Sequence, residues 1–319
     1  MGFTKMVRLK DTGPTEEPGT NSQSQELEKG DLAAREQNHG QIQREHIDPA
    51  VEKRVIRKMD RTVVPLVMAL YLLAFLDRSN IGNARIAGME EDLNLEGDRY
   101  DWLLTIFYIS YILFQWQALM WKLIPPHIWC AFCVFGWGLV STVQAGIHTW
   151  GAEMALRFVM GATEAGYGPG IPYLLSFFYL RDEVGLRQGI FLAAAPLANT
   201  FAGALAYGIT SGNGSLANWR ILFLVEGLPT LAMVPVAWFF LPDSPEQMRS
   251  LTSEEKIVAK ARGVRQAGSA ERVGFVNFKE VLATFASAKP WFTAVSFSIL
   301  SVGDLHMLMV GSLCTSPST

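Results

Sequence analysis

The sequence predicts an all-α membrane protein, with a six-helix transmembrane bundle and a partial seventh helix. Charged residues are only 18% of the chain and apolar residues are 50%, a lower charged share than soluble domains have. Mean hydropathy is positive although the first sixty residues are strongly polar, so the apolar residues are concentrated downstream. Several apolar windows exceed the ~20 residues that a helix needs to cross a bilayer: 102–121, 123–151, 158–180, 188–219 and 221–242.

The N-terminal tail, residues 1–60, is predicted to be disordered and cytosolic. Most of it is Glu, Gln, Lys, Gly, Pro and Ser with almost no aromatic residues, a composition that cannot bury enough apolar surface to fold. No apolar core follows the early basic residues, so we expect no signal peptide. Basic residues then lead into the first span, 62–84, and place this end in the cytosol: Lys53, Arg54, Arg57, Lys58 and Arg61.

The first span ends in a polar cluster that begins with Asp77 and Arg78, about 22 Å into the helix. Two interpretations remain open. Either both side chains lie at the outer interface and reach water, or Arg78 faces an internal cavity and binds an anion. The acidic loop that follows, 90–101, fits an outside location.

The next crossings obey the same charge rule. A turn at 122–127 contains a lysine and two prolines, which end a helix, and we place it in the cytosol. The third span, 128–146, leads to an outer loop at 148–153 without Lys or Arg. The fourth span returns to an arginine-containing cytosolic turn at 181–187.

The fourth span holds the feature that points most directly to function, because Arg157 and Glu164 stand in an otherwise apolar run. At ~100° per residue they share a helix face, about 10 Å apart along the axis. A carboxyl at bilayer depth is costly, which favours a functional role; the alternative is a buried ion pair that only holds helices together. Pro169 weakens the backbone near the end. Small residues on the same stripe allow close helix approach: Gly161, Ala165 and Gly168.

The fifth and sixth spans, 188–210 and 219–241, complete the bundle at residues 61–242. The fifth is rich in alanine, which suits tight packing. The sixth contains Glu226, which is either a second functional carboxyl or the partner of Arg220, and we prefer the pairing.

Residues 243–290 are predicted to be a basic cytosolic linker. Within it, 254–266 has helical periodicity and a thin apolar face that would rest on the membrane surface or on neighbouring helices: Ile257, Val258 and Ala261. Residues 291–319 would form a partial seventh span and a truncated end.

Other chemical classes find no support. Cys130 and Cys133 form a C-x-x-C motif, but they lie in an apolar run without a second pair, so we interpret them as helix-core residues rather than zinc or redox ligands. The sequence has no clustered nucleophile, base or metal ligands typical of a membrane enzyme. We therefore expect no catalytic residue, metal or cofactor, and no nucleic acid as a partner.

Four segments carry a family resemblance: 75–86 (FLDRSNIGNARI), 157–170 (RFVMGATEAGYGPG), 219–227 (WRILFLVEG) and 241–246 (LPDSPE). They resemble the fungal allantoate permease group of anion:cation symporters. With six spans, a basic linker and a seventh span, the chain resembles the N-terminal half of a major facilitator superfamily transporter.

The resemblance implies roles for individual residues. Arg78 and Arg157 would recognise a substrate anion, and Glu164 would couple transport to protons, with Glu226 as a second candidate. A buried carboxyl beside cations can change protonation when the cation is occupied by another anion. The remaining motif residues would be structural: Asp77, Asn80, Gly161, Gly168, Pro169 and Gly170.

The resemblance also implies partners and a location. The group carries small carboxylates such as allantoate, nicotinate, pantothenate and biotin, so we expect a proton-coupled symporter of an organic anion in the plasma membrane, with a cytosolic N-terminus. The family rocks two bundles about a central site, whereas this sequence supplies one. We therefore expect a truncated product that is inactive alone, with self-association as a route to function. The alternative is a membrane nutrient sensor on a transporter scaffold.

Overall fold

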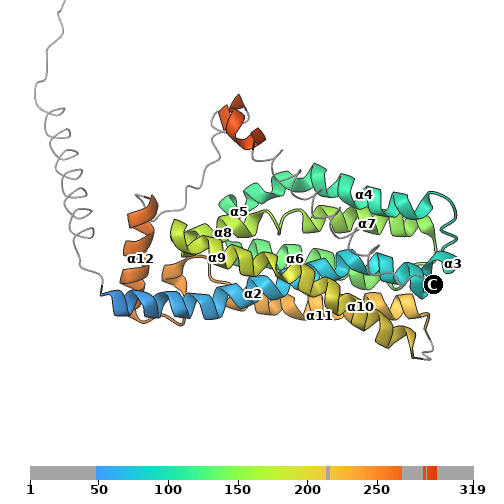
Figure 1. The fold of residues 1–319 in the computed structure, drawn as a ribbon, viewed down its shortest axis with the longest axis horizontal. Helices are drawn as coiled ribbons and strands as arrows, with labels where there is room; N and C mark the ends of the chain where they lie inside the picture. Colours follow the sequence, from blue (N-terminus) through green and yellow to red (C-terminus); the bar gives the residue numbers. More distant parts are fainter. Residues whose placement is uncertain (1–47, 213–215, 268–282, 285, 293–319) are drawn as a thin grey trace, which may run out of the picture.

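The computed structural model describes residues 48–212, 216–267, 283–284 and 286–292. Within these ranges the regular structure is helical, and most of the long helices run along one axis of the molecule (Figure 1). Residues 1–47 and most of the expected seventh span lie outside the described part. The elements in chain order are α2 (Pro49–Ala84), η1 (Arg85–Met89), α3 (Glu90–Asp92), α4 (Arg99–Phe114), η2 (Gln115–Leu119), α5 (Met120–Leu123), α6 (Pro126–Gln144), α7 (Trp150–Glu164), α8 (Gly170–Phe178), α9 (Arg181–Leu192), α10 (Ala194–Thr210), α11 (Asn218–Phe240), η3 (Pro245–Gln247) and α12 (Ser253–Ala267).

The first helix, α2, begins at Pro49, well before the expected start of the first span. Asp48 caps it, accepting a hydrogen bond from the backbone N–H of Ala50 at 2.9 Å, and a proline in the first turn is compatible with a helix start. Val55 and Met59, four residues apart, are fully buried on one face. The prediction that residues 1–60 are disordered is therefore wrong for residues 49–60, which are helical. The many polar residues between Val55, Met59 and the first span made this apolar stripe hard to recognise in the sequence.

Five helical segments are long and apolar enough to cross a membrane: Pro49–Asp92, Arg99–Leu123, Pro126–Gln144, Arg181–Thr210 and Asn218–Phe240. They contain the expected first, second, third, fifth and sixth spans. The expected fourth span is split into α7 and α8.

The break between α7 and α8 covers residues 165–169 and is stabilised by side chains from other helices. The indole Nε1 of Trp121 donates to the carbonyl of Gly166 at 2.5 Å, and the Tyr167 hydroxyl donates to the carbonyl of Val67 at 2.9 Å. These bonds connect the broken segment to its neighbours, as buried backbone outside a helix requires. The sequence predicted a weakened backbone at Pro169, whereas α7 already ends at Glu164, five residues earlier.

Glycines set the close helix crossings. A Cβ on Gly161 would overlap the carbonyl oxygen of Phe107, so α7 approaches the backbone of α4 directly. Gly227 similarly meets the backbone of Thr142, where α11 crosses α6. A Cβ on Gly170 would overlap the Trp121 indole. The close approach that the small-residue stripe predicts is confirmed at Gly161.

The linker helix α12 packs against the start of α2 (Figure 1). Lys58 lies 2.6 Å from Glu255, and Arg262 lies 2.5 Å from Glu183 of α9. The predicted helix is confirmed, and it rests on neighbouring helices. Of the expected apolar face, Ala261 is buried and Val258 packs against the core, whereas the prediction is wrong at Ile257, which is 60% exposed. Residues 255, 259 and 262 share the buried face, because they are spaced as successive turns of one helix.

Candidate functional site

An ion pair between Arg78 of α2 and Glu164 of α7 joins the first and fourth spans. Arg78 donates to the Oε2 atom of Glu164 from Nη2 at 2.6 Å and from Nε at 3.2 Å. The Glu164 side chain is 2% exposed and the Arg78 side chain 23%. Of the two interpretations that the sequence left open for Arg78, the structure favours an inward-facing side chain. The charge that would meet an anion is already neutralised by a carboxylate.

Three aromatic rings surround the Arg78 guanidinium. Its central carbon lies 5.0 Å from the ring centroid of Phe75, 5.2 Å from that of Phe107 and 5.1 Å from that of Tyr111. Rings at this distance stabilise a cation and restrict its position. Among the described residues, the Oε1 atom of Glu164 has no hydrogen-bond partner. The site therefore holds a positioned, partly accessible cation beside a carboxylate with a free oxygen.

Arg157 has a different partner from the one its sequence position suggested. Its Nε donates to Glu153, one turn earlier on α7, at 3.0 Å, and both side chains are almost completely buried, 2% and 0% exposed. The Phe223 ring of α11 lies 5.7 Å from its guanidinium. The Arg157 side chain is therefore buried and paired, with almost no exposure to water. Its i,i+4 spacing to Glu153 is a signal that the sequence reasoning missed.

A second group of polar side chains is buried between α2, α6 and α11. Asp77 accepts a hydrogen bond from the Ser141 hydroxyl at 2.6 Å. Asn80, Gln144 and Glu226 are each 0–2% exposed. Several of their oxygens and nitrogens lack a partner in the described structure, including both carboxylate oxygens of Glu226. Buried polar atoms of this kind are normally satisfied by water, by a bound proton or by a partner in another conformation. The interior between α2, α6 and α11 is therefore polar, within a bundle whose core is mostly apolar.

Glu226 does not pair with Arg220, contrary to our preferred interpretation. Six residues correspond to about 240° around a helix, which directs the two side chains to different faces of α11. Arg220 instead donates to the carbonyl of Ala145 at 2.8 Å and lies 3.1 Å from His148. Glu226 lies within electrostatic range of Asp77 and Arg157. The other interpretation, a second functional carboxyl, therefore remains.

The remaining candidate residues lie inside the bundle or at the α7–α8 break. Asp77 and Asn80 are fully buried, as residues of a structural motif would be. Gly168 approaches the Tyr111 hydroxyl and lies with Pro169 in the α7–α8 break. Cys130 and Cys133 are free and buried in α6, which agrees with their interpretation as helix-core residues. No cluster of three or more potential metal ligands occurs in the part of the chain that the structure describes.

Comparisons with known proteins agree on one family. A model of the Major Facilitator Superfamily matches residues 67–314. The MFS-type transporter efuF of Hormonema carpetanum is 38% identical over 67% of this chain and 44% of its own length. The high-affinity nicotinic acid transporter of Saccharomyces cerevisiae is 36% identical over 65% of this chain and 39% of its own length.

A crystal structure of a bacterial homologue of the human lysosomal transporter Spinster, inward-facing and unoccupied, matches with a TM-score of 0.49 at 18% identity. The match covers 62% of this chain and 44% of that chain. The chain spans about half the length of the curated relatives that it matches.

Proposed function

The chain belongs to the major facilitator superfamily, and from this premise we propose that it carries a small organic anion across a membrane together with protons. It is a multi-pass membrane protein of a transporter family and not an enzyme.

The observation that carries the proposal is the Arg78–Glu164 pair. A carboxylate ligand reaching the exposed part of the guanidinium would compete with Glu164 for the same N–H groups. Glu164 would then be buried without its counter-charge, a state that proton binding relieves. Anion binding and proton uptake are thereby linked at one ion pair.

The substrate class follows from the same site. Arg78 offers a planar guanidinium that can hold a carboxylate through two hydrogen bonds. The surrounding rings of Phe75, Phe107 and Tyr111 suit a small ligand with an apolar or aromatic body. Nicotinate, the cargo named for the yeast relative, has this chemistry. Nicotinate and similar small carboxylates are therefore the first substrates to test.

Arg157 and Glu226 take secondary roles in this proposal. Arg157 would contribute to anion binding only after its contact with Glu153 is released. Glu226, which has no described hydrogen-bond partner for its carboxylate, is the second proton-coupling candidate. Alternating access in this superfamily uses two bundles that face each other, and we propose self-association of the chain as one way to pair them.

We further propose a cytosolic N-terminus in the plasma membrane. The basic residues near the membrane ends gather in the first turns of α2, at the start of α9 and after α11, and such residues favour the cytosolic side.

The test measures nicotinate binding and proton uptake together. Purified protein is titrated with nicotinate by calorimetry in buffers that differ in ionisation enthalpy, which reports the protons taken up with each anion. We expect proton uptake in the wild type and its loss in Glu164→Gln, with binding retained. If nicotinate and a panel of small carboxylates fail to bind, or bind without proton uptake, the proposal fails.

A further inference from the structure

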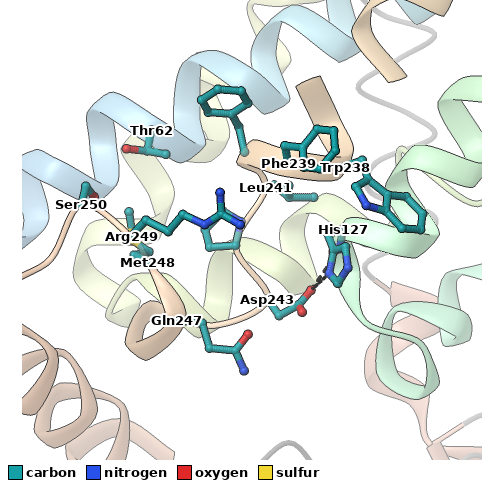
Figure 2. Close-up of a pocket in the computed structure, with 12 residues that line it drawn as sticks. Thr62, His127, Trp238, Phe239, Leu241, Asp243, Gln247, Met248, Arg249 and Ser250 are labelled. Carbon is teal, nitrogen blue, oxygen red and sulfur yellow. Dashed lines mark hydrogen bonds and ion pairs between the residues drawn. The ribbon is translucent and has the colours of Figure 1, made fainter. Parts of the chain in front are cut away.

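A pocket with a volume of about 560 Å³ lies where α11 ends, between α2, the start of α6 and the η3 turn (Figure 2). It is separate from the Arg78–Glu164 site, because ten of its twelve lining residues come from 238–250, the end of α11 and the segment that follows it. It has an aromatic side, with Trp238 and Phe239, and a polar side, with Gln247 and Arg249.

The pocket lies at the end of a membrane span. The last three residues of α11 are all aromatic and exposed: Trp238 by 45%, Phe239 by 61% and Phe240 by 65%. Aromatic side chains at the end of a transmembrane helix prefer the depth of the lipid headgroups. The pocket therefore opens where headgroups and the first acyl carbons meet.

Arg249 provides an available positive charge. Figure 2 shows its side chain reaching into the middle of the residues that line the pocket. Within the described ranges we find no hydrogen bond or ion pair for its guanidinium. The pocket's acidic group, Asp243, is already engaged: its Oδ1 lies 2.7 Å from His127 Nδ1 and accepts from the His127 backbone N–H at 3.1 Å.

The first turns of α2, which lead to Thr62, are also basic. Thr62, on the pocket wall, follows a helical segment with four exposed cationic side chains: Lys53, Arg54, Arg57 and Arg61. Lys58, by contrast, forms an ion pair with Glu255 of α12. Clusters of this size beside a membrane span attract anionic lipids.

We propose that this pocket binds the headgroup of an anionic phospholipid, with Arg249 contacting the phosphate. Gln247 offers amide donors on the same side, while Trp238 and Phe239 contact the glycerol and upper acyl chain. A lipid fits these observations better than a free phosphate ion, because the aromatic side of the pocket is continuous with the exposed end of α11. The site is independent of the transport proposal.

The experiment uses the purified chain in nanodiscs of phosphatidylcholine, alone and mixed with phosphatidylserine, and measures the melting temperature. We expect phosphatidylserine to raise the melting temperature of the wild type, and Arg249→Gln to lose most of that rise. Arg181→Gln is the matched control, since Arg181 is exposed at the start of α9, which forms in place of the expected 181–187 turn, and lies outside the pocket. It should keep the full rise.

Both variants change an exposed arginine, so their melting temperatures in pure phosphatidylcholine should match the wild type. Equal stabilisation of the wild type and Arg249→Gln by phosphatidylserine would overturn the proposal. Inorganic phosphate or glycerophosphate, added to phosphatidylcholine nanodiscs, should have no effect. If either reproduced the rise in an Arg249-dependent way, the ligand would be a soluble anion and the lipid assignment would be wrong.

Discussion

Arg157 and Glu164 lie on one face of α7, seven residues apart, but they belong to different ion pairs. Arg157 is bound to Glu153 of its own helix, whereas Glu164 is bound to Arg78 of α2. A contact within one helix is preserved when helices shift, but a contact between two helices is not. The Arg78–Glu164 pair is therefore the one that a conformational change would break.

Replacing Glu164 with Gln should separate anion transport from proton coupling. In a carrier containing this sequence, we expect Glu164→Gln to lower proton-driven uptake of a carboxylate by at least about tenfold, the effect of ~1.4 kcal/mol. Exchange of labelled for unlabelled substrate at constant pH should persist. Glu90→Gln is the control, because Glu90 pairs with Arg85 and is 43% exposed. Full pH-dependent uptake by Glu164→Gln would move the proton role to Glu226.

Arg157→Ala should destabilise the folded protein. It would leave the Glu153 carboxylate buried without a partner, and breaking a buried pair in this way costs about 3–5 kcal/mol. The double variant Arg157→Met with Glu153→Gln should recover much of the stability, because no uncompensated charge remains. Thermal unfolding in detergent measures both. Identical unfolding of Arg157→Ala and the wild type would show that the pair contributes nothing.

Gly161→Ala should weaken the contact between α4 and α7. The added Cβ would overlap the Phe107 carbonyl, and overpacking of this kind costs about 1–3 kcal/mol. Gly151→Ala is a matched control on the same helix, because nothing lies within 4 Å of its Cβ position. The control should unfold at the wild-type temperature or slightly above it. Equal unfolding temperatures for both variants would contradict the close crossing.

The orientation can be tested by cysteine accessibility. Ser211, after α10, and Ser253, at the start of α12, are both exposed. In a cysteine-free background and intact cells, an impermeant maleimide should label Ser211→Cys from outside. It should label Ser253→Cys only after permeabilisation. Labelling of Ser253→Cys in intact cells would invert the proposed topology.

Docking of α12 on α2 should depend on pH. The hydrogen bond from Lys58 is the main cause that lowers the pKa of Glu255. A lowered folded-state pKa contributes stability above the ordinary glutamate value, about 4.3, and this stability is lost as pH falls through the lowered value. Spin labels at Arg54 and Lys260 should report a narrow distance distribution at neutral pH and a broad one in acid.

Glu255→Gln should broaden that distribution at neutral pH, while Glu254→Gln, which changes an exposed neighbour, should leave it narrow. A distribution that stays narrow in Glu255→Gln would show that Arg262 and its partner Glu183 hold α12 without the Lys58 contact.

The sequence predicted the spans better than it predicted the contacts of their charges. Runs of apolar residues identify membrane helices because the bilayer sets their length. Arg157 contacts Glu153 because the two are one helix turn apart, whereas Glu164 shares the face but lies about 10 Å away along the axis. The start of α2 was missed because buried residues such as Val55 and Met59 are separated by basic ones. The Arg78–Glu164 pair joins residues 86 positions apart, which no local pattern specifies.

The length of α2 gives it a mechanical role. This one helix carries Arg78 near one end and Lys58 near the other, twenty residues or about 30 Å apart. Pro65 lies between them and removes one backbone hydrogen bond, so the helix bends most easily near that turn. We therefore expect a tilt of α2 at Arg78 to displace α12, which is paired to the same helix through Lys58. Bending of α2 at Pro65 would reduce that displacement.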